Sequence, residues 1–317
     1  MKKIVFLDAA TLAPDVVLPK PLFAHQWSNF SATAPHETVA RAQGAEIVVT
    51  NKVRFDAATI AALPQLKLIA VAATGFDHID LAAARAAGVA VANIRAYSVD
   101  SVPEHVFALI LALKRQILPY VADVRGGGWQ AAGLFAFHTH RIGDLRGRRI
   151  GLFGSGASGQ RVAEIARGFG MEPVFSARKG AAPRLGALDF EEVLATSDIL
   201  SLHCPLNAET ENMIGAPEFT RMAKRPLLIN TARGGLVDEE ALERALDDGL
   251  LSGAGIDVTR PEPPPADSAI MRLAQRQNVL VTPHIAWASL ESQQTLADQL
   301  GDVLASFHKG ERLNRLD

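Results

Sequence analysis

The sequence predicts an α/β protein, and three observations support this. Short runs of β-branched residues alternate with alanine-rich stretches of helical spacing, which is the pattern of parallel strands joined by crossover helices. The chain has 317 residues, of which 48% are hydrophobic, enough for two domains with separate cores. A glycine-rich turn directly follows one predicted strand. We therefore expect two doubly wound parallel sheets with a cleft between the domains.

The first domain is predicted from elements near both ends of the chain. Its strands are expected at residues 4–7, 46–50, 68–72 and 89–92. Its helical segments are expected at residues 38–43, 56–62 and 80–87. Gly88 ends the last of these helices. Leucines at helical spacing predict a final helix at residues 289–308, which we expect to return to this domain, so that residues 1–98 and 288–317 fold together.

The second domain is predicted to span residues 99–287. It begins with a helix at residues 101–115. Strands are expected at residues 149–153, 173–175, 199–203, 227–230, 254–257 and 279–282. Six strands in this arrangement suit a doubly wound sheet.

One long segment of the second domain has no clear periodicity. Residues 125–148 are rich in glycine and aromatic residues, among them Trp129, Phe135 and Phe137. Long irregular segments inside compact domains usually have a function. We interpret residues 120–148 as an arm that reaches across a dimer partner.

Composition narrows the choice of partners and compartment. The net charge of −2 gives no electrostatic reason to expect nucleic acid or an anionic membrane. The single cysteine, Cys204, excludes an internal disulfide, suits a reducing cytoplasm, and lies in an apolar context that favours packing over reactivity. The first apolar run stops at Asp8, too short for a signal peptide, and no stretch approaches membrane-spanning length. We expect a cytoplasmic protein.

The glycine-rich turn is a candidate dinucleotide site. Gly154, Gly156 and Gly159 follow the predicted strand 149–153 and open a helix at residues 160–169. In that context the backbone can approach a pyrophosphate at the positive end of the helix. A glycine-rich turn without a ligand is the alternative, and we favour dinucleotide binding.

The residues that would contact the adenosine ribose favour NADP. An acid about 20 residues after the glycine turn would select NAD. This chain has Ser176 and Ala177 there, followed by Arg178 and Lys179. Arg178 can pair with a 2′-phosphate and Ser176 can add a hydroxyl, so NADPH is preferred, with NAD as the second choice. In the alternative interpretation, Arg178 and Lys179 are solvated loop charges.

Three residues in the second half have the chemistry of hydride transfer. His284 can donate or accept a proton near neutral pH, and a carboxylate such as Glu262 can fix its tautomer. The guanidinium of Arg233 can bind a substrate carboxylate through two hydrogen bonds.

A series of ordered motifs carries a resemblance to a known family. The motifs are residues 72–80 (AATGFDHID), 101–105 (SVPEH), 154–159 (GSGASG), 202–206 (LHCPL), 230–234 (NTARG), 255–258 (GIDV), 262–263 (EP) and 282–284 (TPH). In this order the chain resembles the D-isomer-specific 2-hydroxyacid dehydrogenase family from about residue 71 to about residue 289. The ending at residues 287–289 (WAS) and the short chain look most like hydroxypyruvate and glyoxylate reductases.

The resemblance implies a role for each catalytic residue. Arg233 matches the arginine that binds the carboxylate of a 2-keto acid and polarises its carbonyl. His284 matches the acid that protonates the carbonyl oxygen, and Glu262 matches its carboxylate partner. The loop Ala73-Thr74-Gly75 can present backbone N–H groups to the substrate carboxylate as an anion nest. The first domain is then expected to be flavodoxin-like and substrate-binding, and the second a Rossmann domain.

The resemblance also implies a set of cofactor-binding residues. They are Val102, Gly154, Ser155, Gly156, Ala157, Ser158, Gly159, Ser176, Arg178, Lys179, Cys204, Pro205, Thr231, Ala232, Arg233, Asp257 and His284. Asp257 matches a position that holds the nicotinamide carboxamide, although a strand-end aspartate is also a common helix cap. Val102 and Thr231 match positions that line the nicotinamide ring, although an apolar valine is core by default.

Other histidines receive no role, and no metal is expected. His138 and His140 alternate like a metal pair, but no third ligand is nearby in the sequence. His78, His105 and His203 are interpreted as packing or capping residues.

We therefore expect NAD(P)H-dependent reduction of a small 2-keto acid, hydroxypyruvate or glyoxylate first, to the D-2-hydroxy acid by a homodimer. One alternative is a dehydrogenase of another small acid such as 3-phosphoglycerate. The other is a dinucleotide-sensing corepressor or scaffold on the same fold.

Overall fold

The computed structural model describes residues 1–316. The chain divides into two compact units, which are described here one at a time. Unit 1 consists of Met1–Ser98 and the residues from Ala288 onward, and unit 2 is Val99–Trp287. Each unit is built on one parallel sheet with helices packed against it, which confirms the predicted fold class.

Unit 1 contains a five-stranded sheet. Its strands are β1 (Lys2–Phe6), β2 (His25–Asn29), β3 (Ile47–Thr50), β4 (Leu68–Val71) and β5 (Ala90–Ala92). The order is β2-β1-β3-β4-β5 and all pairs are parallel. Four strands lie within two residues of the expected bounds. The edge strand β2 was not expected, because none of its side chains is buried and its sequence has no apolar run.

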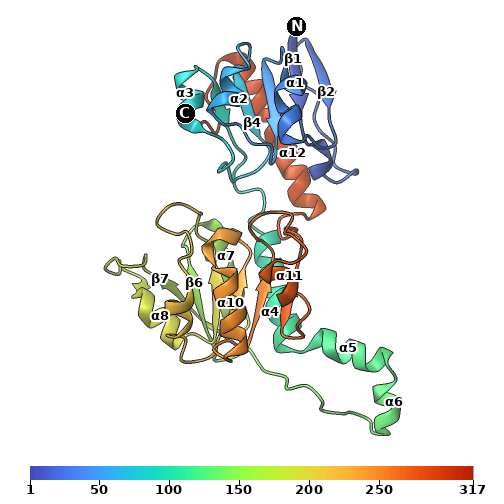
Figure 1. Ribbon diagram of the computed structural model, residues 1–317, viewed down its shortest axis with the longest axis vertical. Helices are drawn as coiled ribbons and strands as arrows, with labels where there is room; N and C mark the ends of the chain where they lie inside the picture. Colours follow the sequence, from blue (N-terminus) through green and yellow to red (C-terminus); the bar gives the residue numbers. More distant parts are fainter. Residues whose placement is uncertain (317) are drawn as a thin grey trace. The chain divides into compact units, whose positions relative to one another are not determined.

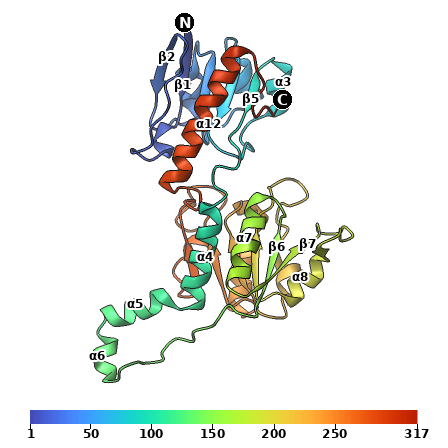
Figure 2. The ribbon, with the colours of Figure 1, turned by 180° about the vertical axis from the view of Figure 1, so that it is seen from behind.

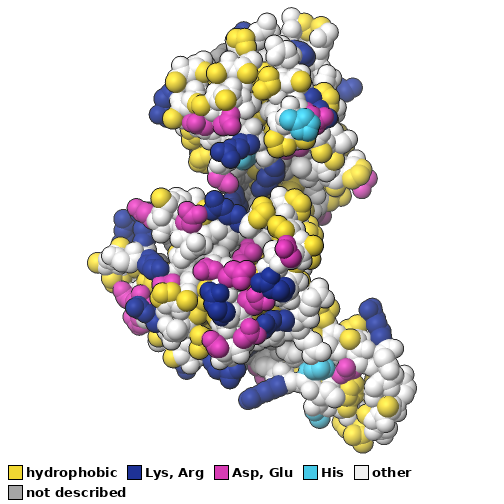
Figure 3. All heavy atoms as spheres, in the orientation of Figure 1, with side chains coloured by type: hydrophobic (Ala, Val, Ile, Leu, Met, Phe, Trp, Pro, Cys, Tyr) yellow, Lys and Arg dark blue, Asp and Glu magenta, His cyan; other side chains and the backbone are white. Residues whose placement is uncertain are grey.

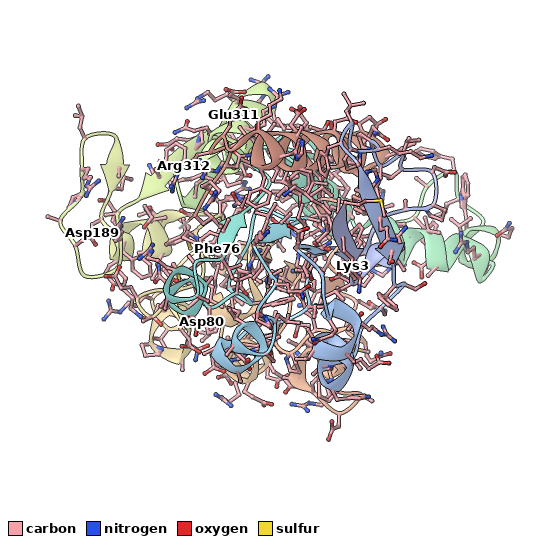
Figure 4. The ribbon with its side chains drawn as sticks, turned by 90° about the horizontal axis from the view of Figure 1, so that it is seen from above. Lys3, Phe76, Asp80, Asp189, Glu311 and Arg312 are labelled. Carbon is pink, nitrogen blue, oxygen red and sulfur yellow. The ribbon has the colours of Figure 1, made fainter. Side chains whose placement is uncertain are left out.

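The helices of unit 1 begin at polar caps. They are α1 (Thr38–Ala42), α2 (Ala57–Ala61), α3 (Leu81–Ala86) and α12 (Leu290–Lys309), with short 3₁₀ turns η1 (Ala9–Thr11) and η2 (Pro35–Glu37). Asp80, labelled in Figure 4, accepts a hydrogen bond from the Ala83 amide at 2.9 Å and so starts α3. Ser289 starts α12 in the same way, and Gly310 ends it with a φ of 78°. This last helix belongs to the same unit as the first residues of the chain.

Unit 2 contains a seven-stranded sheet. Its strands are β6 (Arg149–Phe153), β7 (Glu172–Ser176), β8 (Ala187–Leu188), β9 (Ile199–Leu202), β10 (Leu227–Asn230), β11 (Gly253–Ile256) and β12 (Val279–Val281). The order β12-β11-β10-β9-β6-β7-β8 is that of a Rossmann sheet extended by one strand. The order reverses between β6 and β9, and ligands of such sheets bind at the carboxyl ends of the strands near that point. The two-residue strand β8 was not expected.

Helices cover both faces of this sheet. One face carries α4 (Ser101–Lys114) and α7 (Ala157–Gly168), which Figure 2 shows side by side. The other carries α8 (Phe190–Thr196), α9 (Ala216–Phe219), α10 (Glu239–Asp247) and α11 (Ala269–Leu273), with the turn η3 (Gly234–Leu236) before α10. A separate apolar cluster fills each interface: Ile110 and Val162 belong to one, and Phe190 and Leu242 to the other.

An arm extends from unit 2 between α4 and β6. It contains α5 (Ile117–Arg125), α6 (Gly128–Ala132) and an irregular return segment, and it projects away from the sheet in Figures 1 and 2. No residue of α5 is buried. Apolar side chains lie exposed along the arm, beside its histidines in Figure 3. They include Ile117, Leu118, Val121, Val124, Trp129, Leu134 and Phe135.

Among residues 1–316, no single helix is long and apolar enough to cross a membrane. Only α4 and α5 taken together have the length and composition of a span, and they are bent by 57° where they meet.

Candidate active site

His284 and Glu262 form a hydrogen-bonded pair. Nδ1 of His284 lies 2.7 Å from Oε2 of Glu262, and their side chains are 21% and 32% exposed. The other carboxylate oxygen, Oε1, accepts a hydrogen bond from the backbone N–H of Thr259 at 3.2 Å. Nε2 of His284 makes no hydrogen bond to any described residue. Glu262 therefore fixes the ring by holding the Nδ1 proton, and Nε2 is the atom that can exchange a proton with a substrate.

The backbone of His284 is held in an uncommon conformation. Its φ of 56° lies in the left-handed region, which costs a non-glycine residue on the order of 1 kcal/mol. Asp257, at the end of β11, stabilises the loop: its backbone carbonyl accepts from the His284 N–H at 2.8 Å, and its carboxylate accepts from the N–H groups of Ile285 and Ala286, each at 2.9 Å. Without this support the imidazole would not be held toward Glu262.

Asp257 is itself enclosed by polar partners. The Thr282 hydroxyl donates to Oδ1 at 2.5 Å, and Nε2 of His105 lies 3.0 Å from that hydroxyl. The Asp257 side chain is fully buried. The sequence associated Asp257 with the nicotinamide carboxamide and His105 with packing. In the structure both belong to one network beneath the His284 loop.

Arg233 lies in the loop between β10 and η3. Asn230 shapes this loop, because its side chain donates to the Arg233 carbonyl at 2.9 Å and accepts from the Ala232 N–H at 3.1 Å. Nη1 of Arg233 donates to the Ala232 carbonyl at 2.7 Å. A Cβ on Gly234 would lie only 2.2 Å from the carbonyl carbon of Thr259, so only glycine lets the Arg233 loop pack against the loop that leads to Glu262.

Strand order explains how the three loops share one edge. The strand β11 pairs with β10 on one side and with β12 on the other, all in parallel. Arg233 follows β10, Glu262 follows β11, and His284 follows β12. Their loops therefore leave the same carboxyl edge of the sheet, where Rossmann domains bind ligands.

The glycine turn has the geometry of a dinucleotide site. Gly154 has a φ of 120°, and a Cβ there would lie 2.6 Å from the His203 carbonyl. A Cβ on Gly159 would lie 2.1 Å from the Gly154 carbonyl oxygen, whereas nothing lies within 4 Å of the corresponding position on Gly156. No side chain caps the N-terminus of α7. Ser155, Gly156 and Ala157 are exposed there and Ser158 is half-buried, which leaves backbone N–H groups for a phosphate.

Thr231 also fits a bound cofactor. Its hydroxyl is buried and has no hydrogen-bond partner among the described residues, which is costly unless a ligand supplies one. Ala232 and Val102 are half-buried, and Pro205 is exposed after β9. Cys204 packs with its sulfur 3.5 Å from that of Met213, and burial raises the pKa of the thiol to about 11, so the thiol is unreactive at neutral pH.

The three candidate residues for a 2′-phosphate differ in availability. The guanidinium of Arg178 is exposed and makes no ion pair or hydrogen bond with the described residues. The Ser176 hydroxyl donates to the Ala177 carbonyl at 2.8 Å. The Lys179 ammonium lies 2.8 Å from Oε1 of Glu218, a buried residue of α9. Lys179 was expected to bind the cofactor, but in the structure its ammonium pairs with a carboxylate on α9, whereas Arg178 makes no ion pair with the described residues.

The loop after β4 in unit 1 presents two backbone donors. The Ala73 carbonyl accepts from the Ile94 N–H at 3.1 Å, and the Thr74 carbonyl accepts from the side chain of Asn93 at 2.7 Å. Because a trans peptide points its N–H opposite to its carbonyl, the N–H groups of Thr74 and Gly75 point away from these partners. Neither N–H bonds to another described residue. These two N–H groups are available to an anion, as the predicted nest requires, and the binding of a substrate carboxylate there stays a prediction.

Sequence reasoning missed Asn93 and Asn230, which shape the nest and the Arg233 loop. Both are buried polar residues at or just after the end of a buried strand, and that position was the available signal.

Two further histidines have hydrogen-bonding partners close to them. His140 lies 2.9 Å from Asp123 on the arm, and His203 lies 2.9 Å from the Ser201 hydroxyl. Among residues 1–316, no group of three or more His, Cys, Asp or Glu side chains is arranged to hold a metal ion.

Comparison with known proteins identifies the family. A family profile described as "D-isomer specific 2-hydroxyacid dehydrogenase, NAD binding domain" matches residues 107–286. A glycerate dehydrogenase of Methylorubrum extorquens is 46% identical over 99% of this chain and 98% of its own length. A hydroxypyruvate reductase of Blautia hydrogenotrophica is 32% identical over 98% of both chains. The structure of an acyclic imino acid reductase in complex with NADPH and D-Arg covers 99% of this chain and all of its own, with a TM-score of 0.83 and 28% identity.

These similarities support a nicotinamide cofactor. The protein is an oxidoreductase, and the chain belongs to the D-isomer-specific 2-hydroxyacid dehydrogenase family.

Proposed function

We propose that this protein reduces hydroxypyruvate or glyoxylate to the D-2-hydroxy acid with NADPH. The observation that carries the proposal is the His284–Glu262 pair, held at 2.7 Å with Nε2 open to a substrate. The relatives named glycerate dehydrogenase and hydroxypyruvate reductase support a small, hydroxylated three-carbon acid. The alternative of a 3-phosphoglycerate dehydrogenase is less supported, because two relatives of that name are 34% and 33% identical but this chain spans only 40% and 49% of their length. No observation favours a dinucleotide-sensing corepressor.

The protein's own groups supply binding and proton transfer. When bound, the nicotinamide supplies the hydride that reaches the carbonyl carbon. Arg233 binds the substrate carboxylate and polarises the carbonyl. Nε2 of His284 donates its proton to the carbonyl oxygen, which becomes the hydroxyl. The proton on Nδ1 stays on the ring, held by Glu262, so the residual neutral histidine has one defined tautomer.

We also propose that NADPH is preferred over NADH, because Arg178 is exposed and no acidic side chain follows β7 at the ribose position. A 2′-phosphate would gain a charge-assisted hydrogen bond from the guanidinium. Lys179 contributes by holding the loop to Glu218 at 2.8 Å rather than by contact with the phosphate.

We propose further that the protein is a homodimer through the arm. Isolated exposed apolar residues are common, but here Leu118, Val121 and Val124 form a stripe on a helix without any buried residue. A second copy of the chain would remove this stripe from water. Phe135, which is 96% exposed, extends the apolar surface beyond α6.

Purified protein tests the activity directly. It is mixed with NADPH or NADH and hydroxypyruvate, glyoxylate or pyruvate, and the loss of reduced cofactor is followed. In the opposite direction, 3-phosphoglycerate and D-glycerate are tested with the oxidised cofactors. We expect the highest kcat/KM for hydroxypyruvate or glyoxylate with NADPH. No turnover of any acid, or turnover of 3-phosphoglycerate alone, would refute the proposal.

A further inference from the structure

Behind the Glu262–His284 pair lies a second carboxylate, Glu239. Thr259 links it to the pair. The Thr259 hydroxyl donates to Oε1 of Glu239 at 2.5 Å, and the backbone N–H of Arg260 donates to the same oxygen at 3.2 Å. Thr259 is also the residue whose backbone N–H donates to Glu262. One residue thus joins the two carboxylates.

The position of Glu239 is fixed by the start of a capped helix. It is the first residue of α10, whose N-cap Asp238 accepts from the Ala241 N–H at 3.0 Å. A helix start favours a negative charge, and the hydrogen bonds from Thr259 and Arg260 favour it too. Burial has the largest effect and raises the pKa of Glu239, and the neighbouring carboxylates Glu240 and Asp238 raise it further. The two hydrogen bonds lower the pKa by less, so it lies above the usual range.

The Thr259 backbone also packs closely against Gly234 of η3. A Cβ on Gly234 would lie 2.2 Å, 2.4 Å and 2.5 Å from the carbonyl carbon, carbonyl oxygen and Cα of Thr259. The Thr259 backbone therefore packs directly on the backbone of η3 and is drawn to Glu239 through its side chain. The next residue, Arg260, is held by an ion pair with Glu211 at 2.6 Å. The N–H that faces Glu262 has little freedom to turn.

We propose that Glu239, acting through Thr259, is a positioning residue for the acid/base pair of the proposed reductase. Glu239 holds the Thr259 hydroxyl, the Thr259 N–H holds Oε1 of Glu262, and Oε2 is left to accept the Nδ1 proton of His284. Loss of the Glu239–Thr259 contact weakens the hold of the Thr259 N–H on Oε1 of Glu262, and the Nδ1 proton of His284 is then held less firmly by Oε2. This inference rests on the proposed function, because the pair it serves is the pair assigned to proton transfer.

Kinetics of four variants test the proposal. Thr259→Val has nearly the same shape but no hydroxyl, and Thr259→Ser keeps the hydroxyl. We expect Thr259→Val to lower kcat roughly ten-fold or more, Glu239→Gln to lower it less, and Thr259→Ser to restore most of the activity. Binding of NADPH is expected to stay unchanged in all of them. The control is Glu243→Gln on the same helix, which removes only a contact to Arg272 and is expected to leave kcat unchanged.

A double-mutant cycle separates positioning from general damage. If Thr259 acts through Glu262, then Thr259→Val in a Glu262→Gln background causes little further loss of kcat. Equal losses in both backgrounds, or wild-type kcat in Thr259→Val, would overturn the proposal. Thermal unfolding of each variant identifies any that fails to fold, and in that case Glu239→Gln is carried through the same cycle.

A readout independent of turnover keeps this inference separate from the proposed function. The nitrogen NMR shifts of histidine-labelled protein report the His284 tautomer, assigned with His284→Gln. We expect a proton on Nδ1 in the wild type and a mixture of tautomers in Thr259→Val. An unchanged tautomer in that variant contradicts the positioning role, whereas a wild type without reductase activity contradicts the proposed function alone.

Discussion

Replacement of Glu262 by glutamine is expected to lower kcat about 10- to 150-fold. The carboxylate accepts from Nδ1–H of His284 at 2.7 Å and from the Thr259 N–H at 3.2 Å. Glutamine has the same shape but only one acceptor oxygen, so its NH₂ group must face one of the two donors. The Thr259 N–H is part of the backbone and cannot be lost. The glutamine oxygen therefore stays with Thr259, and the NH₂ group faces Nδ1.

The size of the effect follows from this mismatch. A ring protonated on both nitrogens would place its Nδ1–H against the N–H of the amide, so the proton-donating form loses its partner. A hydrogen bond to a charged group contributes about 1.5–3 kcal/mol. Each 1.36 kcal/mol corresponds to a factor of ten in rate, so the loss of that bond gives the expected range.

The assay is steady-state loss of NADPH absorbance with glyoxylate or hydroxypyruvate, together with NADPH binding followed by fluorescence. Cofactor binding is expected to be unchanged, because Glu262 lies in the loop after β11 and the glycine turn follows β6. Glu243→Gln is the control, since Glu243 pairs with Arg272 on α11 and has no part in holding the loop of Glu262. Wild-type kcat in Glu262→Gln would refute the assignment of His284 and Glu262 as the acid/base pair.

Three further predictions concern the cofactor, stability and assembly. Arg178→Ala should raise KM for NADPH about ten-fold and leave KM for NADH nearly unchanged, because only NADPH has the 2′-phosphate that accepts a charge-assisted hydrogen bond from Arg178. Equal increases in KM for both cofactors would contradict this. Burial lowers the pKa of His203 to about 4 from 6.5, so the unfolded chain binds this proton first as the pH falls. The free energy of unfolding should therefore drop by about 3 kcal/mol between pH 6.5 and pH 4 because of this residue, and urea unfolding of His203→Gln should lack that part of the drop. A variant with Leu118→Glu and Val121→Glu should sediment as a monomer where the wild type sediments as a dimer, and an unchanged sedimentation coefficient would rule out α5 as the interface.

The fold was predictable because its signals are local. Strands β3, β4 and β10 are short runs of buried residues whose apolar character is visible in the sequence. Asp80 and Ser289 are polar capping residues, and each directly precedes the first residue of a helix. The edge strand β2 gave no such signal, since it is defined by pairing with β1 and not by burial of its own side chains.

In the candidate site, too, the sequence shows the chemistry of each residue but not its partners. The chemistry of the side chains made Arg233, Glu262 and His284 candidates, and the resemblance to the family assigned a role to each. Lys179 shows where this reasoning stops. Its charge suggested a phosphate ligand, but a buried carboxylate on α9, 39 residues further along the chain, lies 2.8 Å from it. A sequence shows that a charge is present and does not show which opposite charge the fold brings to it.

By itself, then, the sequence determined the α/β class, the glycine turn and the identity of the reacting groups. The tertiary structure decided which atoms those groups present. It placed His284 in a left-handed conformation supported by Asp257, gave one oxygen of Glu262 to Thr259 and the other to His284, and put Glu239 behind them. The physical reason is that hydrogen bonds are directional and short in range. They form here only after the fold has brought together the loops that leave one edge of neighbouring parallel strands.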